Sequence, residues 1–442
     1  MTPNSAAALS DTSTVLCIVL ILLVPFAAAG LALINTGLGR SRSAAHAMLG
    51  SVLIVCVAAV VYFVCGFSWQ GIAGGAAHTI TISGNRWNLL AAQPWFLRGL
   101  KLDGSPASLQ AWLGILSVAI AAMIPLGSGG DRWRLGACCA STALLAGITY
   151  PIFAHWVWGG GWLGQLGPFY GLGHGFQDAG GTATIQVVGG LTALSIAWIL
   201  GPRRGKYALD GMPAAIPGHN VVYIIFGCVL ALVGWCGLNA AGAILYAGVA
   251  AQSVVLIAVN TILAAASAML ATAIVTRIRF GKPDASLCAN GWVGGLVASS
   301  AAAPFLPPAA AMLVGIGAGL VVPLAVEWLD VRFAVDDPSG AVSVHAVTGI
   351  WGLVALGLLA RFPDAAHAGA SEAPGQWLAQ LVGIATLVGF VLPLTYALNW
   401  LLNRFIPQRV APEGERQGLD LYELGAGAYP EFLTHSDEFL QR

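Results

Sequence analysis

Two nine-residue stretches of this sequence match one another: Asp178-Ala-Gly-Gly-Thr-Ala-Thr-Ile-Gln186 and Asp337-Pro-Ser-Gly-Ala-Val-Ser-Val-His345. Each begins with Asp, has Gly at the fourth place, Thr or Ser at the seventh, and Ile or Val at the eighth. Each ends in a polar residue that precedes a Gly-containing apolar stretch. The alternative to an internal repeat is chance similarity, and the positions of the two stretches among the apolar segments decide between them.

Apolar segments make up most of the chain. Of its 442 residues, 57% are hydrophobic and only 9% are charged, whereas a soluble domain carries roughly 25% charged residues. A membrane-spanning helix needs about 20 apolar residues. We therefore predict an all-α polytopic membrane protein, with residues 1–404 in the membrane domain and 405–442 forming a cytoplasmic tail. The eleven predicted spans lie at approximately 14–36, 46–67, 109–128, 135–156, 180–200, 219–239, 253–276, 286–302, 308–328, 342–360 and 376–402.

The 19 Lys and Arg residues set the expected orientation. If the N-terminus lies outside, 15 of them fall in cytoplasmic segments, and only Arg86, Arg98, Lys101 and Arg361 fall outside. This is the positive-inside bias of membrane proteins, and an even number of spans would destroy it. No basic residue precedes Thr14, so a signal peptide is not indicated and the first apolar run is predicted to be retained. The chain is thus expected in the cell membrane with its N-terminus outside and its C-terminus in the cytoplasm.

The two matching stretches open the fifth and tenth predicted spans, so they enter the membrane from opposite faces. That arrangement indicates inverted repeats, at about 14–200 and 219–360, followed by a last helix at about 376–402. Substrate sites in such folds lie near the membrane midplane. Gln186 and His345 take equivalent places about two turns into their helices. Because polar groups are costly at that depth, both are candidate pore residues; the alternative is that a neighbouring helix satisfies each of them.

The stretch Ala154-His155-Trp156-Val157-Trp158-Gly159-Gly160-Gly161 leads toward Asp178 on the predicted outer side. An indole face near a carboxylate is able to recruit a small cation through cation–π attraction. Interfacial Trp residues are also common in membrane proteins, and an Asp near a helix start also serves as a cap. Both readings of Trp158 and Asp178 remain open at this point.

Catalytic and metal-binding patterns are absent. HExxH, CxxC, P-loop and nucleophile-elbow motifs do not occur, and the eight Cys lie within apolar runs. We therefore expect no enzyme activity, no metal site and no cofactor. The net charge of zero gives no reason to expect a nucleic-acid partner.

Several motifs, in order along almost the whole chain, resemble the ammonium transporter family (Amt/Mep/Rh). They are AHWVWGGG (154–161), DAGGT (178–182), GWCGLNA (234–240), VNT (259–261), GKP (281–283), NGWVGGLV (290–297), Asp336–Pro338 with Val344-His345, and GLDLYELGAGAYP (418–430). The resemblance implies an ammonium transporter fold of two inverted five-helix repeats plus a final helix. It also implies a homotrimer with one pore per subunit, nitrogen uptake across the inner membrane, and a tail that docks a PII-type regulatory protein.

The resemblance also implies roles for individual residues. Trp158 and Asp178 match the outer ammonium-recruitment region, and Trp112 falls where the family has a gating Phe. Phe226, or Ile225 beside it, falls near the second gate Phe. His345 matches the second pore histidine.

Three departures from the family pattern stand out. Gln186 replaces the first pore histidine, Ile34-Asn35 replaces an aromatic pair, and Gly340 replaces an acidic residue. Imidazole accepts and donates protons near neutral pH, whereas a Gln amide does not titrate. The remaining possibilities are passage of ammonia alone, a water-based proton route beside Gln186, or a pore that binds ammonium without useful flux. The leading hypothesis is ammonium or ammonia transport through the lipid bilayer; the alternative is an ammonium sensor.

Overall fold

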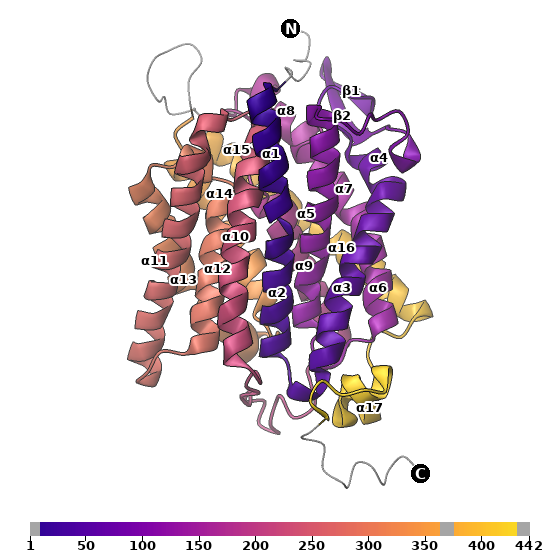
Figure 1. The fold of residues 1–442 in the computed structure, drawn as a ribbon, viewed down its shortest axis with the longest axis vertical. Helices are drawn as coiled ribbons and strands as arrows, with labels where there is room; N and C mark the ends of the chain where they lie inside the picture. Colours follow the sequence, from indigo (N-terminus) through magenta and orange to yellow (C-terminus); the bar gives the residue numbers. More distant parts are fainter. Residues whose placement is uncertain (1–8, 363–374, 431–442) are drawn as a thin grey trace.

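The computed structural model describes residues 9–362 and 375–430 as an elongated bundle of helices (Figure 1). The first half contains α1 (Asp11–Leu23), α2 (Pro25–Leu38), α3 (Ala44–Val61), α4 (Phe67–Gln70), α5 (Pro106–Ser128), α6 (Leu135–Leu144), α7 (Tyr150–Val157), α8 (Trp162–Tyr170) and α9 (Val188–Leu200). The second half contains α10 (Val221–Leu245), α11 (Val254–Phe280), α12 (Ala285–Ser300), α13 (Pro308–Arg332) and α14 (Thr348–Leu359). The chain continues with α15 (Gln376–Thr386), α16 (Leu392–Phe405) and the short α17 (Pro412–Gln417).

Wider π-helical turns and one hairpin complete the fold. The π turns are η2 (Tyr62–Gly66), η4 (Leu145–Thr149), η5 (Thr182–Val187), η8 (Val342–Val347), η9 (Leu387–Val391) and η10 (Asp420–Leu424). Strands β1 (Ala77–Ile82) and β2 (Asn85–Ala91) pair antiparallel between α4 and α5. The short 3₁₀ turns are η1 (Ser41–Ser43), η3 (Trp95–Leu97), η6 (Ala251–Ser253) and η7 (Ala303–Phe305).

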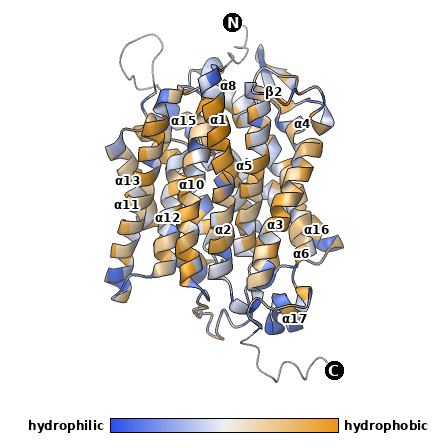
Figure 2. Cartoon of the chain, viewed as in Figure 1, coloured by the Kyte–Doolittle hydropathy of each residue, from blue (hydrophilic) through white to orange (hydrophobic). Residues whose placement is uncertain are grey.

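The helices are long and apolar enough for a membrane protein. Within the described chain, ten helical segments have the length and hydropathy of membrane spans, and many large hydrophobic side chains are exposed on their surfaces. Figure 2 shows hydrophobic residues along the helices, with hydrophilic residues gathered near β2 at one end and α17 at the other. These findings confirm a multi-pass, all-α membrane protein.

One of the eleven predicted spans is shorter than the ten long apolar helices. The predicted span at 286–302 corresponds to α12, which has only 16 residues and is not among the ten. Helix α12 nevertheless packs against α10, α11, α13 and α14. The start of α1 and the short α17 lie at opposite ends of the bundle (Figure 1), which fits an odd number of crossings. The count of eleven stays a prediction.

The internal repeat predicted from the sequence is visible in the backbone. Gly181 and Gly340, each at the fourth place of its stretch, have φ of 87° and 71°. This left-handed conformation favours glycine because it has no Cβ. A six-residue π turn follows each stretch start, η5 in one case and η8 in the other, and each leads directly into an α-helix. The two stretches therefore form the same local structure.

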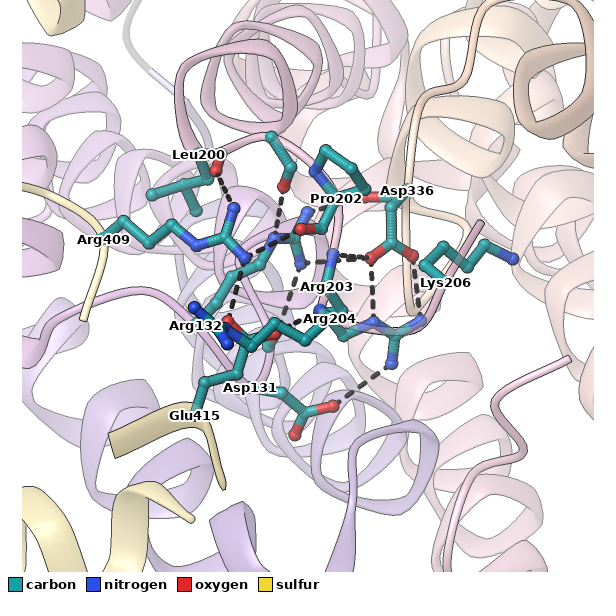
Figure 3. A network of polar contacts seen from close by, with 12 residues as sticks. Asp131, Arg132, Leu200, Pro202, Arg203, Arg204, Lys206, Asp336, Arg409 and Glu415 are labelled. Atoms are coloured by element: carbon teal, nitrogen blue, oxygen red, sulfur yellow. Dashed lines mark hydrogen bonds and ion pairs between the residues drawn. The ribbon is translucent and has the colours of Figure 1, made fainter. Parts of the chain in front are cut away.

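A network of buried charges holds the end of the bundle at which the second stretch begins (Figure 3). The Arg203 guanidinium donates to both carboxylate oxygens of Asp336, at 2.9 Å each, and to Asp131 at 3.1 Å. Arg132 donates to the Asp336 carbonyl at 2.8 Å. Burial alone would raise the pKa of Asp336, but the hydrogen bonds and charges of Arg203 and Arg132 hold it below its ordinary value. The network thus joins the loops that follow α5 and α9 to the loop that precedes η8.

The tail packs against this same end rather than extending away from it. Asp420 is buried, and its carboxylate accepts from the Ala45 and His46 N–H groups at the start of α3, at 3.1 and 2.7 Å. Glu423 accepts from Leu135 N–H at the start of α6, at 2.8 Å, and pairs with His46 at 2.9 Å. The tail acids therefore act as caps for two helices. Residues 431–442, the last part of the predicted tail, lie outside the described residues.

The predicted orientation is testable with two introduced cysteines in a cysteine-free background. Thr81 is exposed on the hairpin, and Leu209 is fully exposed in the loop between α9 and α10. In sealed cells, a membrane-impermeant maleimide should label T81C and leave L209C unlabelled, because the loop after Arg203 carries the basic residues expected inside. Both should react after permeabilisation. Labelling of L209C in sealed cells would show the opposite orientation.

The capping role of the tail predicts a stability loss on Asp420→Ala. The variant leaves the N–H groups of Ala45 and His46 without an acceptor, which should cost about 0.5–2 kcal/mol of unfolding free energy. Thermal unfolding of the purified protein measures the change. Glu413→Ala is the matched control, because the Glu413–Arg416 pair is two-thirds exposed and contributes little. Equal stability of the two variants would count against the cap.

Candidate functional site

An aromatic pair lies at the end of the bundle that carries the hairpin. The rings of Trp158 and Tyr246 stack with centroids 4.1 Å apart and planes 2° apart. The Trp158 indole N–H donates to the Asp178 carbonyl at 2.8 Å, and the Tyr246 hydroxyl donates to the Gln110 carbonyl at 3.2 Å. Because Tyr246 covers one face of the indole, a cation has only the opposite face of Trp158 to contact.

The glycines after Trp158 let several segments meet there. A Cβ on Gly159 would stand 2.3 Å from the Gln70 carbonyl oxygen, and Gly160 has a φ of 78°. The Gly160 carbonyl accepts from Asn88 on β2 at 2.9 Å. These contacts require glycine, as expected for a close backbone approach.

The two carboxylate oxygens of Asp178 differ in their hydrogen bonding. Its Oδ2 accepts from the N–H groups of Ala183 and Thr184 and from the Thr184 hydroxyl, at 3.1, 2.8 and 2.9 Å. Its Oδ1 is buried and has no hydrogen-bond partner among the described residues. The capping and binding readings are therefore compatible, since one oxygen caps η5 while the other is left over. A buried carboxylate oxygen without a donor is costly unless a ligand or water supplies one.

Gln186 and His345 meet in the interior, as the repeat predicts. The His345 Nδ1 lies 2.8 Å from the Gln186 Oε1, and both residues are buried. With the amide oxygen accepting, His345 carries its proton on Nδ1, so its Nε2 is an acceptor. The Gln186 Nε2 donor is buried without a partner. The pair thus presents one free donor and one free acceptor, a combination that suits a small neutral molecule such as water or ammonia.

The departures noted in the sequence gather around His345. A small cavity beside this histidine is lined by Asn35, Asn290 and Ser339 together with apolar side chains that include Ile34. The cavity volume open to water is about 10 Å³, which is close to the lower limit for holding one ordered water molecule. A Cβ at Gly340 would stand 2.5 Å from the Asn290 amide nitrogen. Any side chain at position 340 would therefore displace Asn290 from its place.

The two predicted gate residues, Trp112 and Phe226, lie on α5 and α10. Trp112 is half-buried on α5, two residues after Gln110, the partner of Tyr246. Phe226 is 54% exposed on the outer surface of α10. It precedes Tyr246 by 20 residues of that helix, which corresponds to about 30 Å. The structure does not bring Phe226 to the aromatic site; Ile225 beside it is only half-buried.

Tyr246 was missed by the sequence analysis. Its only signal was an aromatic residue a few positions after the predicted span 219–239, and that pattern is shared by ordinary interfacial residues. The stacking on Trp158 depends on where the ends of α7 and α10 lie relative to one another, which one sequence does not specify.

The fold defines a multi-pass membrane protein whose interior holds the buried polar pair Gln186 and His345. Comparison with known proteins identifies the family. Residues 15–429 match the Ammonium Transporter Family, and the chain belongs to that family. It is similar to the ammonium transporter Amt2 of Archaeoglobus fulgidus, with 35% identity over 94% of this chain and 88% of the relative. It is 31% identical to the ammonium transporter of Bacillus subtilis, over 93% of this chain and 97% of the relative.

Solved structures show the same fold. A structure named Sensor Amt Protein superposes with a TM-score of 0.81 at 26% identity, covering 93% of this chain and 97% of the other. Mep2 of Candida albicans superposes with a TM-score of 0.79 at 24% identity, covering 96% and 91%, and this likeness concerns the fold alone.

The geometry of the outer site predicts separate contributions from the indole and the carboxylate. Trp158→Leu should weaken ammonium binding by roughly 0.5–2 kcal/mol, the range for a partly desolvated cation–π contact. Asp178→Asn keeps an oxygen for the cap but removes the charge, so it should weaken binding at least as much. Isothermal titration with ammonium on purified protein measures both. Trp328→Leu, an exposed Trp on α13, is the control, and unchanged affinity in a folded Trp158→Leu protein would remove Trp158 from the site.

Proposed function

We propose that this chain carries ammonium nitrogen across the cell membrane along a path from Trp158 and Asp178 to Gln186 and His345. The observation that supports this path most directly is the buried Gln186–His345 contact, with its unpartnered Gln186 amide N–H. The family membership gives the class of substrate. The outer aromatic pair and the free Asp178 oxygen suit a small cation, and the interior pair suits a neutral molecule.

Ammonium has to transfer its proton, to water at the outer mouth or to the free Asp178 carboxylate oxygen, before it enters the interior as ammonia. Burying a cation among apolar groups costs several kcal/mol or more, whereas ammonia carries no such penalty. Ammonia is able to accept from the Gln186 Nε2–H and donate to the His345 Nε2. The proton released on the outer side cannot pass along two adjacent imidazoles, because Gln186 stands beside His345 and does not titrate. Ammonia therefore passes this pair without a two-histidine proton relay.

This mechanism predicts a small electrical signal in the native protein and a gain on Gln186→His. Two imidazoles at the same depth would restore groups that accept and donate protons. Proteoliposomes given an ammonium pulse should show little steady current with native protein and a larger current with Gln186→His. Uptake of labelled methylammonium in the same vesicles checks that the native pore is open. The control is Gln252→His, at an exposed Gln in η6.

Large ammonium currents in the native protein, unchanged in Gln186→His, would contradict this electrical prediction. The proton would then travel by a route that bypasses Gln186. If native vesicles bind ammonium but show neither uptake nor current, the sensor function becomes the better account. The fold similarity to the structure named Sensor Amt Protein is compatible with that alternative but does not favour it over transport.

We further propose a homotrimer with its N-terminus outside and its C-terminal tail in the cytoplasm. The distribution of basic residues supports this orientation, because Arg132, Arg203 and the tail lie together at one end of the bundle and basic residues favour the cytoplasmic side. The tail is also our candidate docking surface for a PII-type regulatory protein. Its support is position: η10 contacts the start of α3 and of α6 through Asp420 and Glu423, so a partner that moves the tail would disturb both caps.

A further inference from the structure

Asp337 repeats the arrangement of Asp178 at the opposite end of the bundle. Its Oδ2 accepts from the Val342 N–H at 2.7 Å, five residues along the chain, as Asp178 accepts from Ala183. Its Oδ1 is buried and has no hydrogen-bond partner among the described residues. In both Asp residues of the repeat, therefore, one carboxylate oxygen caps a π turn and the other has no hydrogen-bond partner among the described residues.

A polar cavity lies against Asp337. The cavity volume open to water is about 160 Å³, well above the roughly 10–15 Å³ that one water molecule needs. Ser343 lines the same cavity, is only 1% exposed, and has an unpartnered hydroxyl. The Ser128 hydroxyl on α5 lies beside the Asp337 carboxyl as a weak donor to it. The Asp337 carboxylate oxygen and the Ser343 hydroxyl are thus the two groups at this cavity that need partners.

The other charges around the cavity are paired. Lys206 contacts Asp330 at 2.7 Å, and Arg203 contacts Asp336 and Asp131 at 2.9 and 3.1 Å. Asp337 has no Lys, Arg or His nitrogen within 4.0 Å in the described part of the chain. The charge left without a partner at this cavity is therefore negative, although the paired Arg203 and Lys206 also line it.

We propose that Asp337, with Ser343 and Ser128, forms a second binding site for ammonium at the inner mouth, equivalent by the repeat to the outer site at Asp178. A carboxylate and hydroxyl oxygens accept hydrogen bonds from a small monovalent cation, and the cavity leaves room for its remaining water. Ser343 precedes His345 by two residues in η8, so the site lies along the same segment as the pore histidine. This inference deepens the proposed transport function and rests on it.

An inner site makes the pathway saturable from both sides. Ammonium on the cytoplasmic side would occupy Asp337 independently of Asp178, because the two carboxylates lie at opposite ends of the bundle. The inner site lacks the stacked indole of the outer one, so it depends on the carboxylate and hydroxyl groups alone.

Oriented proteoliposomes separate the two sites. Native protein, Asp337→Asn and Asp178→Asn are compared for the half-saturating ammonium concentration, applied either to the hairpin side or to the tail side. Asp337→Asn keeps an oxygen for the Val342 N–H but removes the charge. It should raise the tail-side value about tenfold, the equivalent of one charged hydrogen bond, and leave the hairpin-side value unchanged. Asp178→Asn should do the reverse, and Ser343→Ala should raise the tail-side value less.

Equal values for native and Asp337→Asn protein on both sides, or equal changes on both sides, would overturn the inner site. A crystal of the native protein soaked with thallium(I), a monovalent ion with strong anomalous scattering, gives a test that needs neither a variant nor transport. Thallium density beside Asp337 is expected, and its absence at a concentration that fills the Asp178 site would overturn the proposal even if Asp337→Asn did not fold. If thallium binds at Asp337 while the native vesicles carry no ammonium, the transport function fails and the inner site stands as a cation site.

Discussion

The structure depends on how two buried carboxylates are satisfied. Asp178 and Asp337 each place one oxygen on the N–H groups that open a π turn, where backbone donors have no intrahelical partner. The caps fix where η5 and η8 begin, and so fix the depth of Gln186 and His345 in the bundle. Each cap holds a charge near the protein interior, and burying such a charge is affordable only because the oxygen bonds to several donors or keeps access to a cavity.

A glycine with positive φ makes each of these caps possible. Gly181 and Gly340 turn the chain between each Asp and the backbone N–H groups that donate to it. At position 340 the same feature has a second effect, since a side chain there would collide with Asn290. Asn290 also lines the polar cavity beside His345, so a side chain at position 340 would alter that cavity.

Charge pairing at the tail end links distant parts of the chain. Arg203 and Asp336 join the loop after α9 to the loop before η8. The tail is bound to the loop after α9 by Arg409, which donates to the Leu200 and Pro202 carbonyls, and by Glu415, which accepts from the Arg204 N–H. Buried ion pairs contribute little net stability, but removing one member leaves an unpaired charge and is costly. The network thus fixes the geometry of the loop that carries Asp337 more than it strengthens the fold. A continuous chain of contacts therefore connects the tail with that loop.

The sequence by itself determined the class of fold, the repeat, and the pairing of Gln186 with His345. These features follow from local patterns: apolar length, the placement of basic residues, and two matched stretches whose glycines require one backbone conformation. Only the tertiary structure decided that Tyr246 stacks on Trp158, that Phe226 faces outward 20 residues away, and that the tail acids cap α3 and α6. Helix rotation and side-by-side packing set these contacts. Helix α10 is hydrophobic all round, so its sequence gives no amphipathic stripe from which to predict which way Phe226 faces.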